Sequence, residues 1–114
     1  MARGSQTTQP IVRTGLAPVL TEPTADGDVV DCGNVALYVT NGSVASINVT
    51  VTATAAQDGL NVEDLVVAVG AGATKLIGPL PGRTFGQASA SADAGRAYVN
   101  YSAQTDVDRA VISF

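Results

Sequence analysis

The stretch that decides the fold class of this 114-residue chain is Leu37-Tyr-Val-Thr-Asn-Gly-Ser-Val-Ala-Ser-Ile-Asn-Val-Thr-Val-Thr-Ala-Thr54. In its second half, Ile47, Val49 and Val51 alternate with polar residues, which is the period of a strand with one buried and one solvated face. The dipeptide Asn41-Gly42 separates this run from an alternating run before it, and Asn-Gly favours a turn because both residues tolerate positive φ angles. The stretch therefore predicts an antiparallel β protein.

The register of these two runs argues against a two-residue turn at Asn41-Gly42. Such a turn would place Leu37 opposite Ser46 and Val35 opposite Asn48, so the apolar face of one strand would meet the polar face of the other. Register is strongly specified where one face of a sheet is buried. We therefore expect a wider loop over roughly residues 40–44, a bulge, or an arch between two sheets.

Short strands recur along the rest of the chain, and turn residues separate them. Several short strands at this spacing, without a helical period, are typical of a β-sandwich or barrel. We predict an all-β fold, a single antiparallel β-sandwich that is Ig-like or jelly-roll-like, over residues 28–114. The expected strands are Asp28–Cys32, Val35–Thr40, Ser46–Ala53, Leu65–Val69, Thr74–Ile77, Ala97–Ser102 and Val107–Phe114.

Residues 1–27 differ from this body and are expected to form an extended N-terminal arm. The segment holds three of the five prolines of the chain, and proline disfavours helix at the residue before it. Its residues Ile11, Val12, Arg13 and Leu16 combine apolar side chains with a positive charge and are our candidates for contacts between subunits. The alternative is that the segment folds as a strand and loop on its own domain.

A second candidate contact region is the Ala/Ser/Gly-rich loop expected over residues 83–96. Loops of this length are uncommon in compact domains unless they bind something or move. Arg83 and Phe85, at its start, are further candidates for contacts between subunits. An aromatic side chain at this place could instead anchor the loop to the core.

Composition and missing residue types exclude several functions. The net charge is −4 without a basic run, which argues against nucleic-acid binding. The chain has no histidine, and its aspartates and glycine-rich turns lack the spacing of calcium or phosphate loops. Its single cysteine, Cys32, allows no internal disulfide, and its start lacks the apolar stretch of a signal peptide. We expect no enzyme, no metal or other cofactor, no small-molecule substrate and no membrane span.

Charged residues make up only 14 % of the chain, against roughly 25 % in typical soluble domains. A surface so poor in charge suits a protein that packs against neighbouring molecules. A small extracellular β module can have the same composition.

Three segments together resemble a known family. They are Val69-Gly-Ala-Gly-Ala-Thr-Lys-Leu-Ile-Gly-Pro-Leu-Pro81, the loop with Phe85, and Ala97-Tyr-Val-Asn-Tyr-Ser102. They are similar to segments of small β-sandwich virion proteins of tailed bacteriophages, especially those that infect actinobacteria. The resemblance covers about residues 28–114 and rests on structural motifs, so it carries over no catalytic residue.

The resemblance implies a capsid decoration (cement) protein that binds and stabilises the head shell. The implied partners are the major capsid protein and neighbouring copies in a homo-oligomer, and the implied location is the virion, after synthesis in the host cytoplasm. One alternative is a head–tail connector or stopper subunit. Another is a bacterial Ig-like adhesion or carbohydrate-binding module, which the scarcity of aromatic residues disfavours.

Overall fold

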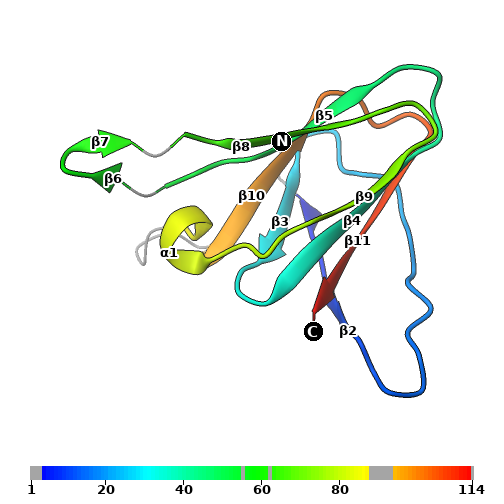
Figure 1. Ribbon diagram of the computed structural model, residues 1–114, viewed down its shortest axis with the longest axis horizontal. Coiled ribbons are helices and arrows are strands. Elements are labelled where there is room, and N and C mark those ends of the chain that lie inside the picture. Colours follow the sequence, from blue (N-terminus) through cyan, green and yellow to red (C-terminus); the bar gives the residue numbers. More distant parts are fainter. Residues whose placement is uncertain (1–3, 55, 62, 88–93, 114) are drawn as a thin grey trace.

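The computed structural model of the chain describes residues 4–54, 56–61, 63–87 and 94–113. Its main body is a sandwich of two β-sheets (Figure 1). Along the five-stranded sheet lie β1 (Gly4–Ser5), β3 (Asp28–Asp31), β10 (Arg96–Tyr101), β5 (Ile47–Val51) and β8 (Leu65–Val69). Along the four-stranded sheet lie β2 (Thr8–Pro10), β11 (Val107–Ser113), β4 (Val35–Asn41) and β9 (Thr74–Ile77). The predicted β-sandwich is confirmed, and all seven expected strands form.

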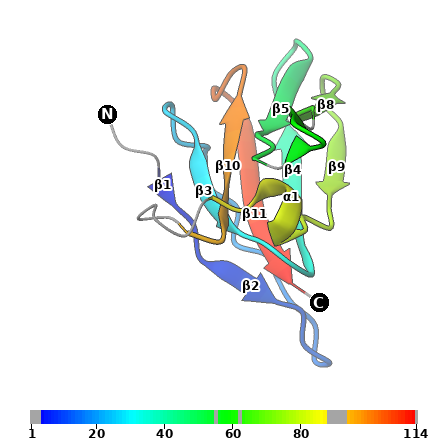
Figure 2. The ribbon, with the colours of Figure 1, turned by 90° about the vertical axis from the view of Figure 1, so that its left-hand side faces the viewer.

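The sheets are mixed, which corrects the expectation of purely antiparallel strands. Strand β1 pairs with β3 in parallel, and β2 pairs with β11 in parallel. Parallel neighbours need a long crossover connection, and the residues between β1 and β3 provide it by passing through the other sheet. Figure 2 shows β1 beside β3 and β2 beside β11, and each of these two short strands occupies an edge of its sheet.

The described part of the N-terminal segment therefore lies on its own body, the second of the two alternatives considered from the sequence. Beyond the two edge strands, Thr21 exchanges two backbone hydrogen bonds with Arg109 of β11, at 3.2 and 2.9 Å. The segment is extended, as its prolines predict. It contributes to both sheets and leaves residues 11–20 as a loop that projects from the sandwich (Figure 1).

The Asn41-Gly42 region is an arch between the sheets, because β4 belongs to one sheet and β5 to the other. Neither residue adopts a positive φ angle, so the Asn-Gly pair does not form the positive-φ turn that this dipeptide favours. The buried Asn41 side chain donates hydrogen bonds to the carbonyls of Ala45 (2.8 Å) and Val69 (3.0 Å), and it accepts one from Ser43 N (3.0 Å). A Cβ atom at Gly42 would lie 3.0 Å from the carbonyl oxygen of Asp106, which favours glycine there.

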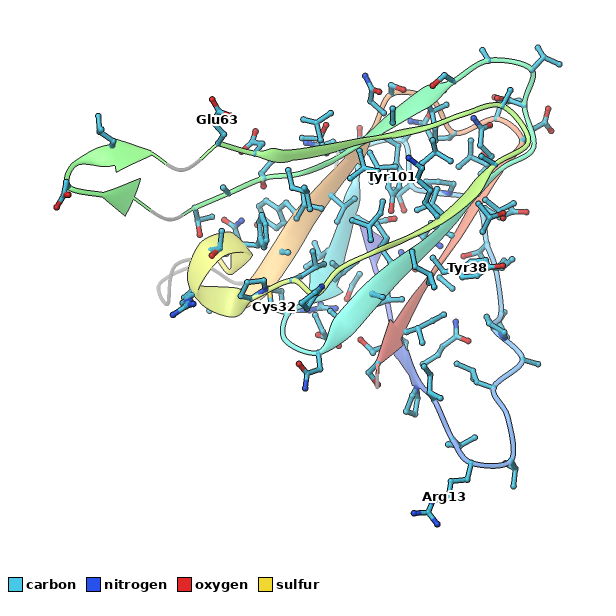
Figure 3. All side chains as sticks on the ribbon, in the orientation of Figure 1. Arg13, Cys32, Tyr38, Glu63 and Tyr101 are labelled. Atoms are coloured by element: carbon cyan, nitrogen blue, oxygen red, sulfur yellow. The ribbon has the colours of Figure 1, made fainter. Side chains whose placement is uncertain are left out.

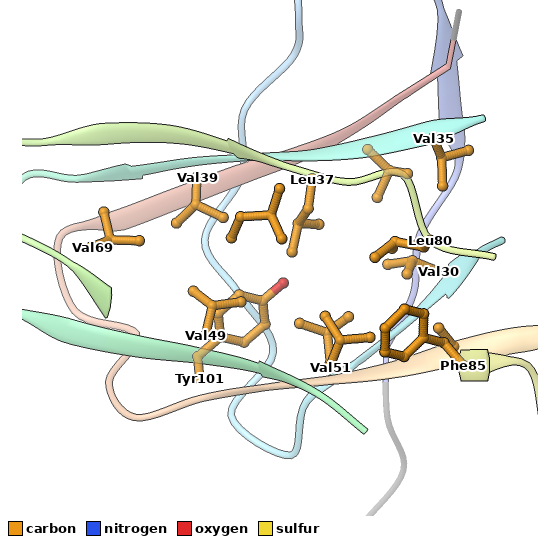
Figure 4. Close-up of a cluster of buried hydrophobic side chains, with 14 of the residues drawn as sticks. Val30, Val35, Leu37, Val39, Val49, Val51, Val69, Leu80, Phe85 and Tyr101 are labelled. Atoms are coloured by element: carbon orange, nitrogen blue, oxygen red, sulfur yellow. The ribbon is translucent and has the colours of Figure 1, made fainter. Parts of the chain in front are cut away.

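The core lies between the two sheets and is mostly aliphatic (Figure 4). Both alternating runs of the Leu37–Thr54 stretch face it, but from opposite sheets. Its fully buried members include Leu37, Val39, Val49 and Val51. The period-two pattern thus correctly predicts which side of each strand is buried. Because the arch places the two strands in different sheets, they do not pair with each other.

A small hairpin extends from the body between β5 and β8 (Figure 1). It consists of β6 (Ala56–Gln57) and β7 (Leu60–Asn61), and its turn is the dipeptide Asp58-Gly59 with φ angles of 54° and 80°. Positive φ at both central positions is the geometry that tight β-hairpins favour. Asp58-Gly59 therefore forms a two-residue hairpin turn, the kind that this dipeptide favours.

The segment expected as a loop over 83–96 begins with the four-residue helix α1 (Gly82–Phe85). Phe85 is 8 % exposed and belongs to the core, so it anchors this segment to the body. Thr54 fastens the helix to the end of β5, since its backbone N–H donates to Thr84 O at 2.8 Å and its hydroxyl to Gly86 O at 2.6 Å. Residues 88–93 lie outside the described residues.

Candidate protein-docking surface

The loop over residues 11–20 is held in place at its base. The side-chain amide of Gln9 donates to Val19 O at 3.0 Å and accepts from Val19 N at 2.9 Å. These two hydrogen bonds between the Gln9 side chain and the Val19 backbone resemble those between paired strands, and they close the loop. Ile11 N donates to the carbonyl of Ser113, the last residue of β11, at 2.8 Å. At the tip, Gly15 N donates to Val12 O at 2.9 Å in a tight turn.

The outer face of the four-stranded sheet is apolar at the end against which this loop lies. The other end of the face carries Thr40, Thr74 and Asp108. The inner positions of β4 fill the core, and its outward positions are Ala36, Tyr38 and Thr40. The register places Ala36 beside Ile112 of β11 and Tyr38 beside Leu76 of β9. An antiparallel sheet with one solvated face normally carries polar residues there. Within the molecule this apolar end is already partly covered, since Ala36 and Ile112 are 5 % and 6 % exposed.

The loop and this face enclose an open groove of about 270 Å³. Its lining is almost wholly apolar and comprises Ile11, Leu16, Pro18, Ala36, Tyr38, Leu76 and Ile112. The loop covers the groove only in part, because Ile11 remains 53 % and Leu76 65 % exposed. We call these seven residues the apolar groove. The exposed apolar side chains of the loop and of β9 make this groove the candidate docking surface.

Of the residues singled out from the sequence, the structure brings Ile11 and Leu16 together in the apolar groove. Val12 and Arg13 are exposed at the tip of the same loop, and Figure 3 shows Arg13 pointing away from the body. Arg83 is exposed on α1, in a different part of the fold. Phe85 faces the core and does not join the groove.

Sequence reasoning missed the residues that the sheet contributes to the groove. Tyr38 and Leu76 are far apart in the chain and become neighbours only through the β4–β9 register. One signal was available: Ala36 and Tyr38 occupy the alternate positions of β4, where a solvated face would carry polar side chains. Leu76 offers no such signal, because it lies beside the inward-facing Ile77 in a short strand.

A buried ion pair fixes the N-terminal segment beneath the loop and was also missed. Asp28 of β3 is fully buried and accepts two hydrogen bonds from the guanidinium of Arg109 of β11, at 2.6 and 3.1 Å. The hydroxyl of Tyr101 donates to the same carboxylate at 2.8 Å, and the amide of Gln6 donates to it at 3.2 Å. Arg109 also donates to the side chain of Thr21. The cluster joins both sheets to the N-terminal segment.

The protonation states of this cluster follow from its contacts. Burial raises the pKa of Asp28, but hydrogen bonds from Arg109 and Tyr101 outweigh it and hold the pKa below its ordinary value. Burial lowers the pKa of Arg109, and its bond and charge pairing with Asp28 more than reverse this. Burial and the charge of Asp28 raise the pKa of Tyr101. The pair is therefore ionised at neutral pH, beside a neutral phenol.

A second, partly exposed ion pair ties down the first strand. The guanidinium of Arg96 of β10 bonds Asp31 at 3.0 Å, and it also donates to Ser5 Oγ at 2.7 Å and to Gln6 O at 3.0 Å. Both ion pairs thus hold residues of the N-terminal segment to the body. The loop over residues 11–20 is presented from a fixed base.

The described residues include a single cysteine, Cys32. No cluster of three or more histidine, cysteine, aspartate or glutamate residues that could hold a metal ion occurs among them. Burial, with the charge of Asp31, raises the pKa of the Cys32 thiol, which lowers its reactivity at neutral pH. Within the described part of the chain, no helix has the length and apolar character needed to cross a membrane.

Comparison of the chain with protein-family models, with curated proteins and with solved structures gave no match in any of the three.

The clamp formed by Gln9 gives a first testable prediction. Gln9→Glu keeps the acceptor for Val19 N but replaces the donor to Val19 O by a carboxylate oxygen, which repels that carbonyl. We expect faster amide hydrogen exchange at Val19 and Gly15 and a loss of global stability of about 1 kcal/mol or less, because the loop is exposed. Gln104→Glu, at the turn before β11, is the matched control and should leave these amides unchanged.

Proposed function

We propose that the chain is a structural protein of a tailed-phage virion, most specifically a capsid decoration protein that binds and reinforces the head shell. The observation that carries the proposal is the apolar groove, an open apolar surface on a rigid β body. The low charge content and the family resemblance support the same assignment. The groove and its loop would be covered in the assembled particle by the major capsid protein or by a neighbouring copy.

The energetics of such binding are modest at each contact. Burial of apolar surface stabilises a complex by about 25 cal/mol per Å², and a stable interface typically covers about 800 Å² on each partner. The groove alone supplies only part of that area, so neighbouring surface must contribute. Repetition of the same contact over a shell adds avidity, which raises the occupancy of every site.

The runner-up function is a head–tail connector or stopper subunit, which would use the same kind of surface. Quantitative mass spectrometry of purified virions separates the two functions. A decoration protein is expected in many copies per particle, and a joining protein in about a dozen or fewer. Absence of the protein from virions would exclude both.

A carbohydrate-binding module is less well supported. Sugar binding usually relies on several stacked aromatic rings, and the groove contains one, that of Tyr38.

Leu76→Asp tests the role of the groove in particle binding. A carboxylate at this largely exposed position should leave the fold intact but oppose burial of the groove in an interface. We expect binding to shells that lack the protein to weaken about tenfold or more, which corresponds to roughly 1.4 kcal/mol. Occupancy of such shells, measured by co-sedimentation over a range of protein concentrations, provides the readout.

Val44→Asp is the matched control for this experiment. Val44 is fully exposed in the loop between β4 and β5, outside the groove, and its replacement should leave binding unchanged. Equal binding by the wild type and the Leu76→Asp variant would show that the groove is not part of the proposed interface.

A further inference from the structure

The hairpin of β6 and β7 carries an exposed apolar side chain on a projecting element. Leu60 follows the Asp58-Gly59 turn and is 74 % exposed. Exposed leucines occur singly on many proteins, but this one stands at the end of a hairpin that extends from the sandwich (Figure 1). An aliphatic side chain in that position is suited to enter a concave apolar site.

The apolar groove is such a site on the same chain. At about 270 Å³ it is somewhat smaller than typical pockets for small ligands, which span roughly 300–1,000 Å³. Its lining offers a ligand almost no polar partner. Both features fit an aliphatic side chain of another protein better than a small polar molecule.

The charges carried by the two segments themselves are opposite in sign. The hairpin and its base, residues 53–65, carry Asp58, Glu63 and Asp64 and no basic residue. The loop that forms one wall of the groove, residues 11–20, carries Arg13 as its one charged residue. The two ion pairs among the described residues, Asp28–Arg109 and Asp31–Arg96, use none of these four charges. Opposite charges beside a projecting leucine and an open groove favour their association.

The two features cannot meet within one molecule. In Figure 3, Glu63 at the base of the hairpin and Tyr38 in the groove lie toward opposite ends of the longest axis. The molecule extends 40 Å along that axis. A contact between them must therefore join two copies head to tail, and each copy then keeps one hairpin and one groove free for the next.

We propose that the groove of one copy takes up Leu60 of the β6–β7 hairpin of the next copy, with Arg13 beside the acidic residues of that hairpin. The occupant of the groove is thus a second copy of this chain. Such a heterologous contact closes into a ring or continues as an open chain, according to the rotation between neighbours. The inference rests on the proposed function only in assigning the groove to a neighbouring copy, and the contact can be tested without any virion.

Disulfide trapping tests this contact on the whole chain. In a Cys32→Ser background, Leu60→Cys is combined with Leu76→Cys and the protein is oxidised with glutathione disulfide. We expect a ladder of dimers, trimers and larger species on non-reducing gels, because every copy carries both partners. Equimolar mixing of the two single variants should give a heterodimer and no ladder.

The matched control combines Leu60→Cys with Val44→Cys, since Val44 is more exposed than Leu76, at 101 % against 65 %, and lies outside the groove. A ladder as strong in this control as in the Leu60–Leu76 pair, or no ladder from that pair, overturns the proposal.

If the cysteine variants do not fold, sedimentation of Arg13→Glu, Glu63→Lys and the double variant tests the same contact. Each single change should weaken self-association about threefold or more, and the double change should restore it. A failure of the double variant to restore association overturns the proposal.

The outcome is distinguishable from that of the proposed function. A ladder from a protein that is absent from virions would support the contact and exclude the virion assignment. A protein abundant in virions that gives no ladder would leave the virion assignment in place and overturn the contact.

Discussion

Replacement of Asp28 by asparagine is expected to lower the free energy of unfolding by about 3–5 kcal/mol at neutral pH. The change leaves the charge of Arg109 buried, at 3 % exposure, without its carboxylate partner. Removal of one member of a buried ion pair costs about this much, because the remaining charge is neither hydrated nor neutralised. Urea denaturation followed by circular dichroism measures the difference.

The same variant should show a distinct dependence on pH. The pKa of Asp28 is lowered in the folded protein, so its contribution to stability is fully present above the unfolded pKa of about 3.9. That contribution is lost as the pH falls through the still lower folded pKa. The difference in stability between wild type and Asp28→Asn should therefore be constant from pH 7 to about pH 5 and should shrink below about pH 4.

Asp31→Asn is the matched control, because it removes a carboxylate from the other ion pair of the same strand. Both side chains of the Asp31–Arg96 pair are partly exposed, and such pairs contribute only about 0–1 kcal/mol. Comparable losses in the two variants, or a difference for Asp28→Asn that persists at low pH, would contradict the role assigned to the buried pair.

Asn41→Asp is expected to destabilise the protein by about 2–4 kcal/mol. The change replaces the amide that donates to the carbonyls of Ala45 and Val69, and it places a carboxylate oxygen against those carbonyls. The side chain is almost completely buried, so water cannot take over the lost bonds. Each buried acceptor left without its donor costs about 1–3 kcal/mol. The Ser43 hydroxyl, shared between Asn41 Oδ1 (2.6 Å) and Ala45 O (2.9 Å), offsets part of this loss.

Thermal unfolding measures this effect, and Asn48→Asp in the same stretch serves as the control. Asn48 points to the exposed side of β5, and its replacement should change stability by about 0.5 kcal/mol or less. If Asn41→Asp unfolds at the temperature of the wild type, the side chain does not hold the arch together.

The strands of the body were predictable because one face of each is buried. Alternation along Ile47–Val51 reports that burial directly, and the structure confirms this element. The strands β1 and β2 were not predictable in the same way. They are edge strands of two and three residues with few buried side chains, so their sequence lacks an alternating pattern.

Only the loop residues of the apolar groove were predictable from the sequence, and the sheet residues were not. Ile11 and Leu16 were identified because apolar residues are conspicuous in a proline-rich, extended segment. Tyr38 and Leu76 meet them only after β4 and β9 pair and the loop over residues 11–20 folds back across that sheet. The buried ion pair has the same origin, since Asp28 and Arg109 lie on strands of different sheets.

By itself, the sequence determined that Leu37–Thr54 forms two strands, which side of each is buried, and that no tight Asn41-Gly42 hairpin can join them. Local alternation suffices for these conclusions, because the side chains of a strand point to opposite faces in turn. The tertiary structure decided that the two strands belong to different sheets and that Asn41 fastens the arch to the end of β8. Those outcomes depend on bonds to Val69 and Ala73, which are remote in the sequence, so no pattern within the stretch encodes them.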